Sequence, residues 1–291
     1  MHEVEAKGIL SARNGMNIYR GCQHGCIYCD ARSRCYQMHH AFEDIEVKRN
    51  APELLEEALL RKRRRCMIGT GAMSDPYIPL EREQRLTRRC LEIIERHGFG
   101  LAIQTKSADI LRDLDLLRAI NERAKCVVQM TLTTDDEALC RIVEPNVSTT
   151  LERVEALARL KEAGISTVVW LCPILPFIND TQENIRGILA YCREVGVRGI
   201  LCFSMGMTLR EGNREYYYRQ LDAHFPGLKR RYAHTYGNTY EILSPNHDAL
   251  MRTFMDFCAQ NSIQSDVAQN FAYLAAWKEQ GERAQQMTLF E

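Results

Sequence analysis

The chain has 291 residues, of which 45% are hydrophobic and 26% charged, the ordinary balance of a globular protein with one large domain or a domain and an appendage. Its 38 basic side chains match 38 acidic ones, which argues against strong non-specific binding to nucleic acid but allows a local basic patch. The charged first residues exclude a secretory signal, and no apolar run approaches the length of a membrane span, so we expect a cytoplasmic protein.

After a lead-in over residues 1–19 and a cysteine-rich loop, short apolar runs alternate with helical patterns. The runs that predict strands lie at 66–69, 101–104, 126–132, 167–171 and 199–203. Helices are predicted between them, with one at about 109–120, one opened by a capping box at Thr149 and Glu152, and one at about 181–195. A strand before the cysteine loop makes about six units, fewer than a closed barrel has. We therefore predict an α/β fold, a partial (β/α)6 barrel with parallel strands.

The pattern changes near residue 205. Aromatic and basic residues interleave between 216 and 240, and two helices are predicted at about 247–260 and 266–279. We accordingly divide the chain into a core over 1–204, a mixed, mainly helical C-terminal extension over 205–280 that packs on the core, and a tail over 281–291.

Three cysteines, Cys22, Cys26 and Cys29, lie in one short loop that also contains two glycines. They suit three ligands of a small inorganic cluster, and three ligands for four irons leave one iron open to a cofactor or substrate. Cys35 makes a four-cysteine structural zinc site the alternative, although zinc sites usually pair two Cys-x-x-Cys units and this chain contains one. Most of the other cysteines are scattered singly, which is typical of a reducing compartment.

Polar residues follow the predicted strands at the edge where ligands gather in such folds. Ser74 and Asp75 lie in the loop after residues 66–69, Lys106 follows the next strand, and Thr131 shares a face with Thr133 near the end of the third. Alone, each residue has an ordinary explanation in turn formation, exposure or β-propensity. Together with the cysteine loop, they favour a site that binds an ammonium group and a carboxylate.

The string Asn17-Ile-Tyr-Arg-Gly-Cys-x-His-Gly-Cys-x-Tyr-Cys29 resembles the signature of radical S-adenosylmethionine (SAM) enzymes, in the branch related to spore photoproduct lyase. The resemblance covers about residues 13–204 and implies a partial barrel of the radical SAM type. It implies a [4Fe-4S] cluster on the three cysteines and an electron donor such as flavodoxin or ferredoxin. It also implies that S-adenosylmethionine is cleaved reductively to a 5′-deoxyadenosyl radical, which abstracts hydrogen from a substrate. The residues that it assigns to S-adenosylmethionine are Tyr28, Ser74, Asp75, Lys106 and Thr131.

The chain departs from that branch at Ala72. In spore photoproduct lyase a cysteine at this place, two residues before the serine, returns a hydrogen atom to the product radical. Thymine-dimer repair by the same final step is therefore not expected, and Tyr77, Cys172 and Cys202 are the alternative donors unless they are only structural. The substrate stays open, with nucleic acid as a candidate. The contrasting hypothesis is a non-enzymatic nucleic-acid or protein adaptor with a structural zinc site.

The last residues contain a further motif. Gln286, Met287, Leu289 and Phe290 resemble the short peptide by which bacterial repair proteins and polymerases bind the sliding clamp. Two adjacent apolar anchors can fill a hydrophobic pocket while the glutamine forms hydrogen bonds at its rim. The alternative is a chance match, with the two apolar residues folded back on the barrel or disordered.

Overall fold

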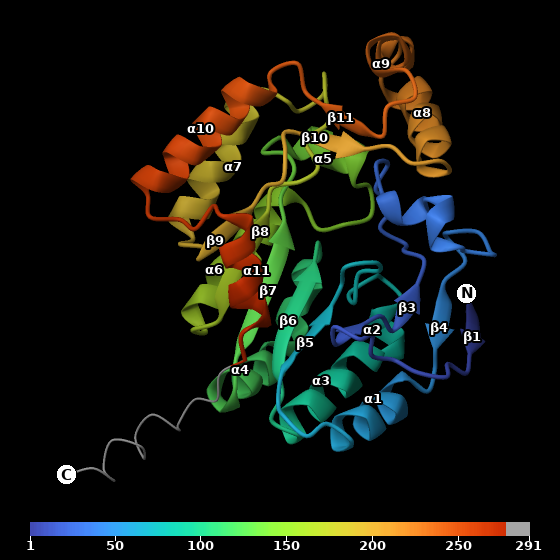
Figure 1. Cartoon of the computed structure of the whole chain (residues 1–291), viewed down its shortest axis with the longest axis vertical. Coiled ribbons are helices and arrows are strands. Elements are labelled where there is room, and N and C mark those ends of the chain that lie inside the picture. The colour runs from blue at the N-terminus through green and yellow to red at the C-terminus, as the bar shows by residue number, and fades with distance from the viewer. Residues whose placement is uncertain (278–291) are drawn as a thin grey trace.

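The centre of the computed structural model, which describes residues 1–277, is a six-stranded parallel sheet (Figure 1). Its strands follow one another in chain order, so a crossover connects each neighbouring pair. The predicted α/β class and the partial barrel of six parallel strands are confirmed. The strands are β2 (Gly15–Met16), β5 (Met67–Thr70), β6 (Gly100–Thr105), β7 (Cys126–Thr131), β8 (Ser166–Trp170) and β9 (Gly199–Leu201).

Helices form the crossovers and cover the outer face of the sheet (Figure 1). Their buried residues belong to one large apolar cluster with strand residues such as Ile68, Ile103 and Val128. The α-helices up to the sixth strand are α1 (Ala51–Leu60), α2 (Glu81–Gln84), α3 (Leu86–Arg96), α4 (Leu114–Arg123), α5 (Glu137–Val143), α6 (Thr150–Glu162) and α7 (Gln182–Glu194).

Two of the helix predictions illustrate what local signals determine. The capping box is present as predicted: the Thr149 hydroxyl accepts from the backbone nitrogen of Glu152, whose carboxylate accepts from that of Thr149. The helix predicted at about 109–120 was wrong in its first turn. A 3-10 helix occupies Ala108–Asp113, because the Ser107 hydroxyl caps that shorter turn, and the α-helix begins at Leu114.

A small second sheet, which the sequence did not predict, is formed by segments on both sides of the cysteine loop. Strands β1 (His2–Val4), β4 (Glu46–Lys48) and β3 (Tyr19–Arg20) form a small sheet in the order β1-β4-β3, beside the main sheet (Figure 1). These strands have two or three residues each, too short for a periodic pattern. Strand β3 ends directly before the cysteine loop and β4 follows the loop in the chain, so the small sheet anchors this segment from both sides.

The chain after residue 205 folds over two parts of the core. Strands β10 (Gly206–Thr208) and β11 (Glu241–Leu243) pair with each other, and α8 (Asn213–His224) and α9 (Leu228–Tyr236) lie between them in the chain. The apolar residues of these two helices share a cluster with Cys26, Ile27 and Tyr28. The predicted helix at 247–260 is confirmed as α10 (His247–Gln260), which packs along α7 (Figure 1).

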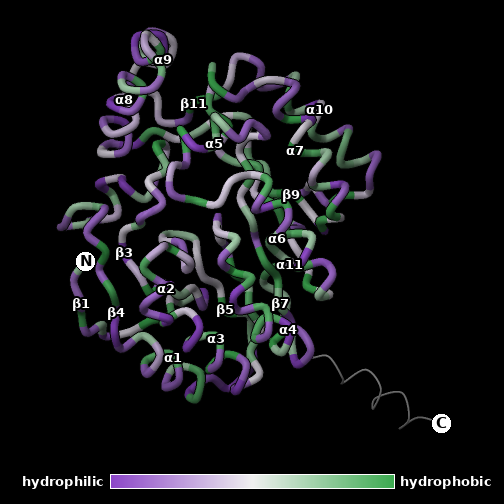
Figure 2. Tube along the Cα trace, turned by 180° about the vertical axis from the view of Figure 1, so that it is seen from behind, coloured by the Kyte–Doolittle hydropathy of each residue, from purple (hydrophilic) through white to green (hydrophobic). Residues whose placement is uncertain are grey.

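The last described helix, α11 (Val267–Ala275), lies against the inner face of the sheet. Its Leu274 packs with Met67, Ala102, Val127 and Val168 of four successive strands. The helix is shorter than the predicted range of 266–279, whose last two residues lie outside the described part of the chain. Figure 2 shows hydrophobic residues along the central strands and hydrophilic ones around the outer α8 and α9. Within residues 1–277, no helix combines the length and the apolar character that a membrane crossing requires.

Candidate active site

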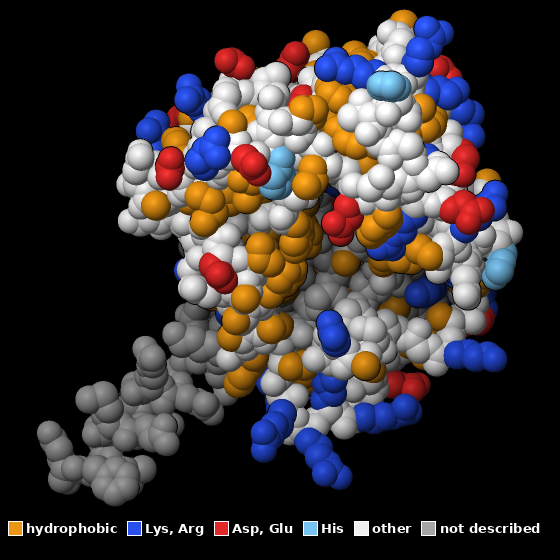
Figure 3. All heavy atoms as spheres, turned by 45° about the horizontal axis from the view of Figure 1, so that its top comes forward, with side chains coloured by type: hydrophobic (Ala, Val, Ile, Leu, Met, Phe, Trp, Pro, Cys, Tyr) orange, Lys and Arg blue, Asp and Glu red, His pale blue; other side chains and the backbone are white. Residues whose placement is uncertain are grey.

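A cavity of about 580 Å³ lies where the carboxyl ends of the sheet strands meet the cysteine loop and the β10–β11 hairpin. Figure 3 shows the molecule hollowed there, with hydrophobic side chains gathered along one side of the hollow. The eight residues predicted to hold the cluster or S-adenosylmethionine all line this one cavity, although they come from four separate segments. They are Cys22, Cys26, Tyr28, Cys29, Ser74, Asp75, Lys106 and Thr131.

The cysteine loop is held by backbone contacts at both ends. The nitrogen of Cys22 donates to the oxygen of Phe42 at 3.3 Å, and that of Ile27 donates to Val143 at 3.0 Å. Gly21 has a φ of +89°, and a Cβ at this position would lie 2.4 Å from the Phe42 oxygen. Only glycine permits this close approach. The glycine before the first cysteine is therefore a geometric requirement of the loop.

Cys26 is buried, Cys22 and Cys29 are half-buried, and the ammonium group of Lys106 lies near them. Burial raises the pKa of Cys22 to about 12 and also raises the pKa values of Cys26 and Cys29, while Lys106 acts in the opposite direction on the last two. Thiolates are the ligand form of cysteine, and a bound metal centre would add to Lys106 the positive charge that stabilises them. The donor set of three thiols on one wall thus fits an iron–sulfur cluster.

The sulfur atoms of the three loop cysteines do not form a group as compact as the ligands of one metal ion. Within residues 1–277, the one group of three or more His, Cys, Asp or Glu ligand atoms that all lie within 4.8 Å of one another contains none of these cysteines. Two sulfurs on the same zinc ion lie at most about 4.6 Å apart, twice a Zn–S bond. Cys35, the fourth ligand of the zinc alternative, is exposed and lies 3.4 Å from a guanidinium nitrogen of Arg210.

Ser74 and Asp75 connect the loop after β5 to its neighbours. The Ser74 hydroxyl donates to the Gly21 oxygen at 2.6 Å, next to Cys22. Asp75 Oδ1 accepts from the Tyr77 nitrogen and from the Thr105 hydroxyl, each at 2.8 Å. Both side chains therefore order the cavity wall in addition to lining it.

His24 is a cavity residue that the sequence reasoning used only as part of the signature. Its Nδ1 lies 3.5 Å from Asp75 Oδ2, and both side chains are buried. Burial lowers the pKa of His24, so the imidazole is neutral at pH 7.

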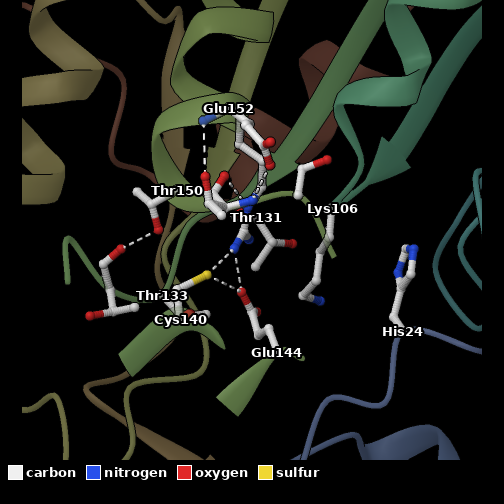
Figure 4. Close-up of polar contacts among 12 residues, drawn as sticks. His24, Lys106, Thr131, Thr133, Cys140, Glu144, Thr150 and Glu152 are labelled. Carbon is white, nitrogen blue, oxygen red and sulfur yellow. Dashed lines mark hydrogen bonds and ion pairs between the residues drawn. The ribbon is translucent and has the colours of Figure 1, made fainter. Parts of the chain in front are cut away.

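Lys106 points into the cavity from the end of β6. Its Nζ lies 5.8 Å from the centre of the Tyr28 ring. Figure 4 shows the Lys106 side chain beside that of Glu144. Burial acts to lower the pKa of Lys106, but Cys26, Glu144, Cys29 and Asp75 outweigh it and raise the pKa. The ammonium group is therefore charged and has access to the cavity, as the partner of an anionic group must be.

A buried ion pair, which the sequence reasoning missed, holds the carboxyl end of β7 in place (Figure 4). Arg153 of α6 and Glu144 are both almost fully buried and pair with each other. Arg153 Nη1 also donates to the Thr131 oxygen at 2.7 Å, while Glu144 accepts from the Tyr28 hydroxyl. The pair thus links the sheet to the cysteine loop. The available signal was an arginine on the apolar face of α6.

The cavity distinguishes among the alternative hydrogen donors. Ala72 and Cys172 line it. Tyr77 is buried outside it with its hydroxyl on Asp113 at 3.1 Å, and Cys202 is buried next to Met251. Of the three side chains named as substitutes for the missing cysteine, Cys172 is therefore the one with access to a bound molecule.

Three aromatic rings continue the cavity wall outward. Trp170 and Phe203 line the cavity with centroids 5.7 Å apart, and Phe271 of α11 lies 6.1 Å from each. Phe203 and Phe271 are 53% and 41% exposed, unusual for large apolar side chains. We call these three residues the aromatic shelf. They are distant in sequence, so no local pattern indicated them.

Comparison with known proteins gives one family and several relatives. The model of the radical SAM superfamily matches residues 16–189, more than half of the chain. An uncharacterized protein of Mycobacterium tuberculosis is 28% identical over 263 residues, which cover 87% of this chain and 75% of that protein. A radical SAM Nα-GlyT isomerase of Pseudomonas phage M6 is 22% identical over 175 residues, covering 60% of this chain and 35% of the phage protein.

Among solved structures, spore photoproduct lyase complexed with dinucleoside spore photoproduct has a similar fold. The TM-score is 0.59 at 16% sequence identity, and the match covers 84% of this chain and 72% of that one. At this identity the similarity concerns the fold alone.

Proposed function

We propose, from the premise that the chain belongs to the radical SAM superfamily, that it cleaves S-adenosylmethionine reductively at a [4Fe-4S] cluster and abstracts hydrogen from a substrate. The observation that carries this proposal is the convergence of three cysteines and five polar or aromatic residues on one cavity. When bound, the cluster and S-adenosylmethionine supply an electron and a 5′-deoxyadenosyl radical, respectively.

In this proposal each side chain has one task. Cys22, Cys26 and Cys29 hold the cluster, and Lys106 pairs with the methionyl carboxylate at the cavity wall. Asp75 and Ser74 orient the loop that receives the ammonium group, and Thr131 presents its hydroxyl to the cofactor from the end of β7. Tyr28 closes the wall behind them through its hydrogen bond to Glu144.

The structural-zinc alternative has less support. The exposed Cys35 and the spread of the cysteine sulfurs do not suit a four-cysteine zinc site. The cavity beside the cysteines is also larger than a structural ion needs, because structural zinc sites are closed by their own ligands. A zinc protein is colourless, whereas the proposed enzyme is brown when purified without oxygen.

We infer that the substrate carries a planar ring, with nucleic acid as the favoured class. The aromatic shelf supports this because bases stack on such rings whatever their sequence. The dinucleoside spore photoproduct bound to the lyase of similar fold agrees with it. Glu241 at the cavity rim does not attract phosphates, so the reacting base, rather than the backbone, would enter the cavity.

The partners follow from the same chemistry. The cluster needs a one-electron donor such as flavodoxin or ferredoxin, which fits a cytoplasmic enzyme with many unpaired thiols. The proposed sliding-clamp motif, Gln286, Met287, Leu289 and Phe290, lies outside the described residues, and clamp binding stays a proposal from the sequence.

The experiment that tests the function measures 5′-deoxyadenosine. The reconstituted protein is reduced anaerobically with dithionite in the presence of S-adenosylmethionine, with and without single-stranded oligonucleotides. We expect 5′-deoxyadenosine and methionine in equal amounts, and more of both with the correct substrate. The Cys26→Ala variant is the control for cleavage by the reductant alone. If wild-type protein forms no more 5′-deoxyadenosine than this variant, the proposal is wrong.

A further inference from the structure

A second group of side chains that can bind a metal lies beside the small sheet and contains none of the cysteines. His2 on β1 lies beside His40 and Asp44, and a ligand atom from each lies within 4.8 Å of the other two. The imidazole rings are edge to face with centroids 4.9 Å apart, and His2 Nδ1 lies 2.9 Å from Asp44 Oδ2. Two imidazoles and a carboxylate are a ligand set for a divalent transition-metal ion.

The orientation of His40 prepares it for coordination. Its Nδ1 lies 3.0 Å from the backbone oxygen of Ala41, which can only accept, so Nδ1 carries the proton. Nε2 then has the free lone pair, and this atom is buried without a hydrogen-bond partner. A buried, unpaired acceptor is unfavourable unless something fills its place. Metal-bound histidines commonly donate their other ring nitrogen to a backbone oxygen in this way.

Two carboxylates, those of Asp44 and Glu46, supply negative charge beside the imidazoles. The amino group of Met1 lies 3.1 Å from Asp44 Oδ1, so Oδ2 is the oxygen on the side of His2. Glu46 Oε2 lies 3.8 Å from His40 Nε2 and adds negative charge at the same face.

We propose that His2, His40 and Asp44 form a binding site for one divalent transition-metal ion of the zinc or nickel class, separate from the iron–sulfur centre. The site is structural. It joins β1 to the segment that precedes β4, and the same segment receives the Cys22 nitrogen at Phe42. Occupancy of the site therefore stabilises the strand arrangement from which the cysteine loop begins.

The test uses untagged, cluster-loaded protein, so that the three loop cysteines are occupied by iron. Equilibrium dialysis against Zn²⁺, followed by elemental analysis, gives zinc and iron per chain from one sample. We expect one zinc per wild-type chain, with an affinity at least about tenfold weaker in His40→Gln, His2→Gln and Asp44→Asn. The matched controls are His39→Ala, which removes an exposed neighbouring imidazole, and Cys35→Ala, which removes an exposed thiol.

Thermal unfolding provides the second measurement. Zn²⁺ should raise the melting temperature of the wild-type protein and of both controls, because it binds the folded state, and it should not raise that of His40→Gln. Iron content should be equal in all variants, which separates this proposal from the function of the cluster. Less than half a zinc per wild-type chain, or equal binding by His40→Gln and wild type, overturns the site.

Discussion

Asp75 Oδ2 accepts a hydrogen bond of 2.7 Å from the backbone nitrogen of Lys106. One carboxylate thereby joins the loop after β5 to the end of β6 and sets the direction in which the lysine leaves the strand. Gly71 makes the contact feasible, because a Cβ there would lie 1.9 Å from the Gln104 oxygen. The geometry of the proposed cofactor pocket thus depends on a hydrogen bond between residues that are both proposed to serve it.

The charge of Lys106 gives the first prediction. Lys106→Met keeps the length of the side chain and removes the partner of the methionyl carboxylate, so binding of S-adenosylmethionine should weaken by about 2–5 kcal/mol. That is roughly thirtyfold or more in Kd. Anaerobic equilibrium dialysis on cluster-loaded protein measures it, with the exposed Lys161→Met as the control. Equal affinity in the Lys106 and Lys161 variants would remove Lys106 from the site.

The cysteine loop gives the second. Changing Cys22, Cys26 or Cys29 to alanine should abolish cluster binding, because each removes one of three ligands. Cys35→Ala should leave it intact, since this thiol is exposed outside the cavity. Iron and acid-labile sulfide after reconstitution decide the matter. Loss of the cluster from Cys35→Ala to the same degree as from the others would contradict the three-ligand arrangement.

Ala72 gives the third. The wild-type protein should not efficiently revert the dinucleotide spore photoproduct, because the cavity carries no thiol at that place. Product analysis after anaerobic incubation with the defined photoproduct tests this, and Ala72→Cys should increase any reversion. Efficient reversion by the wild type would show that another donor serves, and Cys172→Ala would then show whether it is the thiol that lines the cavity.

The buried pair of Arg153 and Glu144 gives the fourth. Arg153→Met leaves the Glu144 carboxylate buried without its partner and should destabilise the fold by about 3–5 kcal/mol. Urea unfolding measures the loss, and Arg153→Met combined with Glu144→Gln should recover part of it. An exposed arginine on the same helix, Arg159→Met, is the control. A loss no larger than that of the control would show that the pair does not stabilise the fold.

The same pair sets an acid limit. Burial acts to raise the pKa of Glu144, but Arg153 and then Lys106 outweigh it, and the pKa is lowered from 4.5. A carboxyl group with a lower pKa in the folded state contributes stability above its unfolded pKa and loses it as pH falls through the folded value. The free energy of unfolding should therefore decrease below about pH 4.5, and less so in Glu144→Gln.

The tail gives the fifth. A fluorescent peptide of residues 282–291 should bind a purified bacterial sliding clamp at about micromolar Kd, because Leu289 and Phe290 can anchor in an apolar pocket. Fluorescence anisotropy measures the binding. The peptide with both anchors changed to alanine is the control, and binding that this control shares would end the idea of a specific clamp motif.

The parallel sheet could be predicted from the amino-acid sequence, because the apolar runs and helix caps that build it are local signals. The sequence also predicted an iron–sulfur site, since Cys22, Cys26 and Cys29 lie within one loop whose glycine permits close backbone contact. Ser74, Asp75, Lys106 and Thr131 were predicted from their positions after the strands, their chemistry and the family resemblance, and the carboxyl ends of the parallel strands bring them to one cavity.

The partners of those residues became visible in the folded structure. Arg153 looked like an ordinary helix residue until the fold brought it to Glu144 and Thr131. The aromatic shelf and the group of His2, His40 and Asp44 likewise join segments that no periodic pattern links. Local sequence encodes propensity and spacing, whereas buried ion pairs, ring stacks and ligand groups depend on contacts between distant segments, which exist only once the chain has folded.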